Sequence, residues 1–218
     1  MQLGELQTPA LLVDIDALDF NLRTMAEALP GPRLRPHVKA YKCTTLARRQ
    51  AELGSRGFTC ATIREVEGMA AAGLGEDLLL ANEVLDARRL GALDARVTVA
   101  VESEATVAAV AEGGVAEVLV DVNVGLPRCG CAPEDAARIA AAARSRGPEA
   151  RGATAHAAHL PAHPDRDARS RGVAQPPAQP ARPHAQDGGE LISAGGTGSY
   201  YINQLATEIQ AGSYALMD

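Results

Sequence analysis

The sequence predicts an α/β protein built as a (β/α)8 barrel of the TIM type. The chain has 218 residues, an ordinary length for one barrel. From about residue 33 to 150, short runs rich in Val and Leu alternate with Ala, Glu and Arg stretches of helical spacing. This alternation implies parallel strands joined by helical crossovers. Later apolar runs bring the expected strands to eight, which favours a barrel over a doubly wound sheet.

The expected elements follow one another at regular spacing. Strands are expected at residues 34–39, 57–60, 77–81, 96–101, 117–122, about 150–156, 191–194 and 211–217. Helices are expected at about 43–54, 62–73, 84–93, 103–113 and 133–147. Ala, Leu and Val must fill the core, because hydrophobic residues make up 46% of the chain and aromatic residues only 3%.

A strand and a helix are expected ahead of this series. Residues 8–14 have the pattern of a strand, and Asp16 is the expected N-cap of a helix that runs to about Leu29. Pro30, Gly31 and Pro32 would end this helix.

Composition suits a soluble cytoplasmic protein. The net charge of −6 and the lack of a long basic run argue against nucleic acid as the partner. No apolar run approaches the ~20 residues that cross a bilayer. No secretory signal precedes the cysteines, so reduced thiols are expected. Cys129 and Cys131 form only a C-x-C pair, which is too weak a motif to assign a metal ligand.

Residues 153–187 differ from the rest of the chain. They are rich in Pro, Ala, His and Arg and almost devoid of large aliphatic side chains. One interpretation is a disordered insertion. The other, which we favour, is translation of GC-rich DNA out of frame, because ordinary composition resumes abruptly at Glu190. Both interpretations predict that this segment packs poorly against the barrel.

Lys39 is the first candidate for chemistry. It follows the first expected barrel strand, and barrel active sites lie at the carboxyl ends of the strands. Apolar neighbours would desolvate its amine and favour the neutral form that Schiff-base chemistry needs. A surface lysine near a strand end is the alternative that position alone allows.

Two further loops could complete a site at the same end. Glycines and hydroxyls after the seventh expected strand, including Gly196 and Thr197, can direct backbone N–H groups at a phosphate, and Gly212-Ser213-Tyr214 could complete that site. Arg128, after the fifth strand, could place a cation at the barrel mouth. An ordinary loop and a structural ion pair are the alternatives.

Together these segments resemble the fold-type III pyridoxal-phosphate enzymes, specifically the D-threonine aldolase and D-serine dehydratase group, which is related to the alanine racemase N-terminal domain. The resemblance covers roughly residues 5–152 and 190–218. It is carried by residues 8–10, 57–62, 121–130 and 207–214, and above all by the motifs Arg35-Pro36-His37-Val38-Lys39-Ala40-Tyr41-Lys42 and Ser193-Ala194-Gly195-Gly196-Thr197-Gly198.

The resemblance implies a role for each matching residue. Lys39 would hold pyridoxal 5′-phosphate as a Schiff base, and Arg128 would face the phenolic oxygen of the cofactor. Gln210 stands where racemases place an arginine against the pyridine nitrogen, which weakens the case for racemase chemistry. The full set of implied cofactor-binding residues is Lys39, His37, Arg128, Gly195, Gly196, Thr197, Gln210, Gly212 and Ser213.

The chain also departs from this family. Tyr41 replaces the usual histidine, and the expected Gly-Tyr-Glu-Gly-His motif near Gly152 is replaced by a sequence without the tyrosine. Relatives continue beyond Asp218 into a C-terminal β-domain that carries the ligands of a divalent metal. We therefore expect an incomplete barrel that lacks this domain and its metal site.

The expected function is that of a pyridoxal-phosphate-dependent lyase, acting on a D-3-hydroxy amino acid such as D-threonine or D-serine and impaired by truncation. A non-catalytic protein of pyridoxal-phosphate homeostasis is the alternative from another class, because such proteins are single barrels of similar length. An amino-acid racemase and a barrel that has lost its cofactor are further alternatives. The small-molecule substrate is expected to be a D-amino acid, and a homodimer is compatible with the resemblance.

Overall fold

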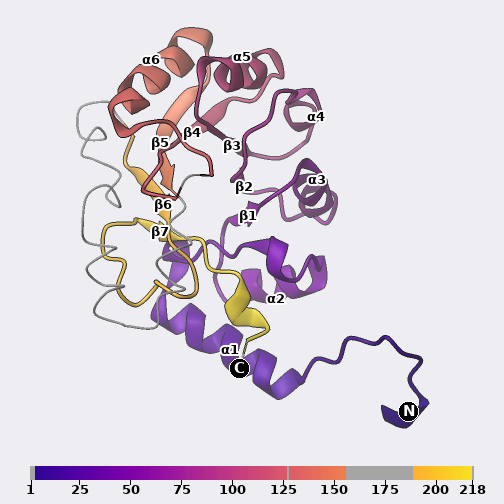
Figure 1. The fold of residues 1–218 in the computed structure, drawn as a ribbon. Helices are drawn as coiled ribbons and strands as arrows, with labels where there is room; N and C mark the ends of the chain where they lie inside the picture. The colour runs from indigo at the N-terminus through magenta and orange to yellow at the C-terminus, as the bar shows by residue number, and fades with distance from the viewer. Residues whose placement is uncertain (1–2, 127, 156–188, 218) are drawn as a thin grey trace.

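The computed structural model describes residues 3–126, 128–155 and 189–217. Its centre is one sheet of seven parallel strands in sequential order. The strands are β1 (Phe58–Cys60), β2 (Leu78–Leu80), β3 (Val97–Val101), β4 (Glu117–Asp121), β5 (Glu149–Ala155), β6 (Leu191–Ala194) and β7 (Glu208–Ile209). Figure 1 shows this sheet curving through the molecule with helices along its outer side. The predicted α/β barrel is confirmed.

Residues 34–37 join the two edges of the sheet. Leu34 forms a parallel bridge with Ile209 of β7, and His37 forms one with Thr59 of β1. The backbone N–H of His37 also donates to the carbonyl of Ala211 at 2.9 Å. This segment therefore occupies the position of the first barrel strand, as expected, although its pairing is too short to form a regular strand.

Helices connect the strands as the alternating sequence predicts. They are α2 (Thr44–Glu52), α3 (Ile63–Ala71), α4 (Arg88–Gly91), α5 (Glu104–Glu112) and α6 (Ala136–Arg146), with α1 (Ile15–Ala28) ahead of the barrel. The short 3-10 helices are η1 (Leu3–Glu5), η2 (Gly31–Arg33), η3 (Val38–Ala40), η4 (Pro133–Asp135) and η5 (Ser213–Ala215). In the described part of the chain no helix has the length and apolar character that a bilayer crossing requires.

Small and branched aliphatic side chains fill the core, as composition predicts. One cluster lies between the sheet and the helices that follow its strands, with buried Leu80, Val99 and Val120 among its members. A second cluster joins α1 to β7 and η5 through Leu22, Ile209 and other buried residues. Tyr41 packs against both clusters.

A polar network crosses the barrel near the amino ends of its strands. Arg35 Nε contacts Glu208 Oε1 at 2.6 Å, and Arg35 Nη2 contacts Asp77 Oδ2 at 2.6 Å. Arg151 contacts Asp77 Oδ1 and Glu117 Oε2, each at 3.2 Å. Burial alone would raise the pKa of Asp77, but the charges and hydrogen bonds of Arg35 and Arg151 outweigh it, so that the pKa is lowered.

Two predictions near the amino terminus are wrong. Residues 8–13 form no strand but extend away from the barrel (Figure 1), and the Leu11 and Leu12 side chains there are exposed. Helix α1 begins at Ile15 because the Asp14 side chain, not that of Asp16, accepts the free N–H groups, from Asp16 and Ala17. A strand needs a neighbour to take its backbone hydrogen bonds, and residues 8–13 have none among the described residues.

Two predictions in the second half also need correction. The last strand is β7, whereas residues 213–215 of the expected strand at 211–217 form η5. Residues 153–155 belong to β5 and pair with β4 and β6, so the predicted start of the poorly packing segment at residue 153 is wrong. Residues 156–187 lie outside the described residues.

Candidate active site

A cavity of about 320 Å³ opens at the carboxyl ends of the strands. It is lined by all the residues that the sequence singled out for cofactor binding: His37, Lys39, Arg128, Gly195, Gly196, Thr197, Gln210, Gly212 and Ser213. Sequence reasoning did not assign the remaining lining residues, which are Ala40, Ala81, Asp121, Thr154 and Ala155. A volume of this size lies within the range of small-molecule sites.

Lys39 lies in η3, directly after the segment that joins β7 to β1. It is exposed by surface area, yet it lines the cavity. Burial of its amine lowers its pKa from the ordinary value of 10.5, and the positive charge of Arg128 lowers it further, against an opposing effect of Glu65. Lys39 therefore reaches the neutral amine form at a lower pH than an isolated lysine does.

The glycine loop after β6 needs its glycines for conformation and space. Gly195 has φ +80°, and a Cβ there would lie 2.9 Å from Asn203 Nδ2. The Gly196 N–H donates to Ser199 Oγ at 3.1 Å, which fixes the turn. Thr197 Oγ1 accepts the N–H of Tyr214 at 3.1 Å, so this loop is joined to the one after β7.

Gly212 provides close approach in the second loop. A Cβ at this position would lie 2.6 Å from the backbone oxygen of His37. Within the described residues, the backbone N–H groups of Thr197, Gly212 and Ser213 have no hydrogen-bond partner. Such N–H donors on two adjoining loops are suited to a phosphate group.

Hydrogen bonds hold the Gln210 side chain in place in the cavity wall. Its Nε2 atom donates to Ser193 Oγ at 2.9 Å and to Thr154 Oγ1 at 3.0 Å. Thr154 in turn donates to the backbone oxygen of Ser193 at 2.9 Å. These bonds fix a neutral amide in the cavity wall, where it can hydrogen-bond to a ring nitrogen without supplying a charge.

Asp121 is the charged lining residue that sequence reasoning missed. It ends β4 and is buried, and burial together with the neighbouring carboxyl of Glu83 raises its pKa to about 8. Cys129 completes a compact group with Glu83 and Asp121. The signal in the sequence is an acidic residue at the end of an expected strand, where the segment 121–130 begins.

The Tyr41 side chain does not line the cavity. Its hydroxyl donates to Gln50 Oε1 at 2.5 Å, and Gln50 Nε2 donates to the Tyr214 hydroxyl at 2.7 Å. Burial raises the pKa of both phenols. Tyr41 therefore supports the fold around the loops and does not line the site.

Comparison with known proteins places this geometry in a family. The family model described as alanine racemase, N-terminal domain, matches residues 13–215. D-threonine aldolase of Arthrobacter sp. is 35% identical over 99% of this chain and 62% of its own length. The crystal structure of D-threonine aldolase from Filomicrobium marinum has a TM-score of 0.89 at 32% identity, covering 99% of this chain and 64% of that one.

A dehydratase has the same fold. D-threo-3-hydroxyaspartate dehydratase from Delftia sp. HT23 has a TM-score of 0.83 at 26% identity, covering 98% of this chain and 62% of that one. The chain thus spans less than two thirds of the length of these relatives. With most of its residues matched by the family model and its cavity at the carboxyl ends of the strands, the chain belongs to the alanine racemase N-terminal domain family.

Proposed function

We propose that this chain binds pyridoxal 5′-phosphate in the cavity, with Lys39 as the attachment point, and that the protein acts as a lyase on D-3-hydroxy amino acids. The observation that carries the proposal is that the residues implied by the family resemblance come from separate loops and line one cavity. The relatives named as aldolases and as a dehydratase support the lyase class.

The cavity residues fit the parts of this cofactor. Free N–H groups of Thr197, Gly212 and Ser213 would bind the phosphate. Arg128 lines the cavity and would pair with the phenolic oxygen, and Lys39 offers an amine whose pKa is lowered. When bound, pyridoxal phosphate supplies an electron sink for the bond that is broken next to the amino group.

Gln210 favours a lyase over a racemase. Its amide is neutral and is committed to Ser193 and Thr154, so it supplies no positive charge to the ring nitrogen. Lys39 is a base that this chain can provide at the cavity. A lyase of the proposed kind thus requires one positioned amine and a bound substrate hydroxyl.

The cofactor proposal is tested by reduction and mapping. The purified protein is incubated with pyridoxal phosphate, treated with borohydride and digested, and the modified peptide is identified by mass spectrometry. We expect the label on Lys39, with Lys39→Ala unlabelled and Lys42→Ala labelled as in the parent. Label on Lys42 would sink the assignment of Lys39.

The reaction is tested with D-threonine and a divalent metal. Aldol cleavage yields glycine and acetaldehyde, whereas dehydration yields ammonia and a 2-oxo acid. Either product pair from D-threonine, and none from L-threonine, supports the lyase. Inversion to an L-amino acid would indicate a racemase, and cofactor binding without any product would indicate a non-catalytic binder.

A further inference from the structure

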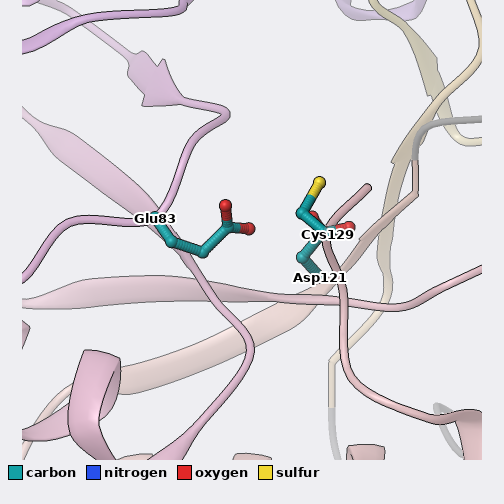
Figure 2. A group of neighbouring side chains, drawn as sticks. All are labelled: Glu83, Asp121 and Cys129. Atoms are coloured by element: carbon teal, nitrogen blue, oxygen red, sulfur yellow. The ribbon is translucent and has the colours of Figure 1, made fainter. Parts of the chain in front are cut away.

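We propose that Glu83, Asp121 and Cys129 form a binding site for a divalent cation of the zinc class at the edge of the cavity. Figure 2 shows the Glu83 carboxylate directed toward Asp121 and Cys129. One ligand atom of each residue lies within 4.8 Å of the others. All three ligands belong to the barrel.

Three chain segments bring these ligands together. Glu83 follows β2, Asp121 ends β4, and Cys129 lies in the loop after β4. That loop is held directly after Cys129: the Gly130 N–H donates to Glu102 Oε2 at 2.6 Å, and the Cys131 N–H donates to the Asp121 backbone oxygen at 2.9 Å. These two hydrogen bonds hold the backbone that carries the thiol next to Asp121.

Neither carboxylate has a cationic partner, whether lysine, arginine or histidine, within the described residues. In that part of the chain, Oε1 of Glu83 is buried and has no hydrogen-bond partner. Asp121 is 6% exposed. Two adjacent buried carboxylates are costly unless a proton or a cation neutralises them.

The donor set selects the kind of cation. A thiolate with two carboxylates suits Zn²⁺ and other borderline metals, whereas Mg²⁺ and Ca²⁺ prefer oxygen alone. Arg128 Nε and Nη2 each lie 3.4 Å from Cys129 Sγ and place a positive charge beside the site. Burial nevertheless raises the pKa of the Cys129 thiol to about 11, so a cation must displace the thiol proton when it binds. Three protein ligands leave one position open, as in catalytic zinc sites.

The open coordination position would allow the cation to bind an atom of a molecule in the cavity. Asp121 also lines the cavity that Lys39 lines, so a bound cation lies at the cavity edge. There it can polarise an oxygen of the molecule that occupies the cavity. The site is inferred from its ligands alone and does not depend on pyridoxal phosphate.

The test is a titration of the full chain with Co²⁺, in the absence of pyridoxal phosphate. Co²⁺ replaces Zn²⁺ and gives a thiolate-to-metal charge-transfer band in the near ultraviolet, which histidine or carboxylate ligands do not give. We expect this band to saturate at one equivalent and to disappear when Zn²⁺ is added. Cys129→Ser should abolish the band, whereas Cys43→Ser, at an exposed cysteine outside the site, should retain it.

A second pair of variants tests the carboxylates without removing the thiol. Glu83→Gln should weaken Co²⁺ binding at least about tenfold, because loss of a ligand exceeds the usual effect of an outer contact. Glu104→Gln, at an exposed residue paired with Arg138, should not change it. Circular dichroism confirms that each variant is folded. Absence of the band in the parent, its persistence in Cys129→Ser, or unchanged affinity in Glu83→Gln would overturn the proposal and leave a shared proton between the carboxyls.

Discussion

The backbone N–H of Tyr214 donates a hydrogen bond of 3.1 Å to Oγ1 of Thr197. This contact joins the loop after β6 to the loop after β7, and both loops line the same cavity. Thr197 therefore has two roles in the proposed site: its backbone N–H, which has no partner among the described residues, can donate to a phosphate oxygen, and its hydroxyl holds the second loop in position.

Thr197→Val is expected to weaken binding of pyridoxal phosphate by up to roughly tenfold. The valine removes the acceptor for the Tyr214 N–H, and a hydrogen bond between neutral groups contributes about 0.5–1.5 kcal/mol. The measurement is a titration followed by absorbance. Thr197→Ser should restore most of the affinity, and equal affinity in the Val variant would show that the loop contact has no role in binding.

The reactivity of Lys39 should depend on Arg128. Because the pKa of Lys39 is lowered, its amine should react with an acylating reagent at a midpoint pH below 10.5. Arg128→Gln removes a neighbouring positive charge, which favours the protonated amine and moves the midpoint to higher pH. Arg128→Lys should keep it near the parent value. Mass spectrometry of the modified peptide against pH measures the midpoint; no shift in the Gln variant would contradict the prediction.

Arg35→Met should destabilise the fold by about 3–5 kcal/mol, because it leaves the buried Glu208 carboxylate without its Arg35 partner and leaves Asp77 with Arg151 alone. Arg88→Met is the control: that side chain is 80% exposed, and solvent screens its pair with Asp86, so stability should not change measurably. Urea unfolding followed by circular dichroism measures both changes. Similar stability of the two variants would show that the network is not structural.

Replacing each of two glycines by alanine should have opposite effects on the stability of the protein. Gly212→Ala places a Cβ 2.6 Å from the His37 backbone oxygen, so the loop must shift, and both stability and cofactor affinity should fall. Gly68→Ala lies in α3 with nothing within 4 Å of the new Cβ, and should stabilise the protein by about 1 kcal/mol. Thermal unfolding with and without pyridoxal phosphate separates the two effects. A stabilised Gly212→Ala protein would rule out the close approach as a constraint.

Local patterns were sufficient for most of the fold. Alternating apolar runs and helical stretches predicted the order and type of the elements from residue 34 to 155, because parallel strands buried on both sides are continuously apolar. The same patterns failed at residues 8–13 and 213–215, where the residues are apolar enough for a strand but have no partner strand in the described structure. Apolar character identifies a segment that could be buried, whereas pairing decides whether it becomes a strand.

The sequence by itself determined the barrel order, the lysine after its first strand and the two glycine loops, since each of these is a property of neighbouring residues. Only the tertiary structure decided that Glu83, Asp121 and Cys129 meet, that Tyr41 turns toward Gln50, and that Gln210 is held by Thr154. Such groupings depend on which loops the barrel places side by side at the ends of its strands. The distances between these loops cannot be read from spacings along the chain, because they are set when residues 34–37 close the barrel between its two edge strands.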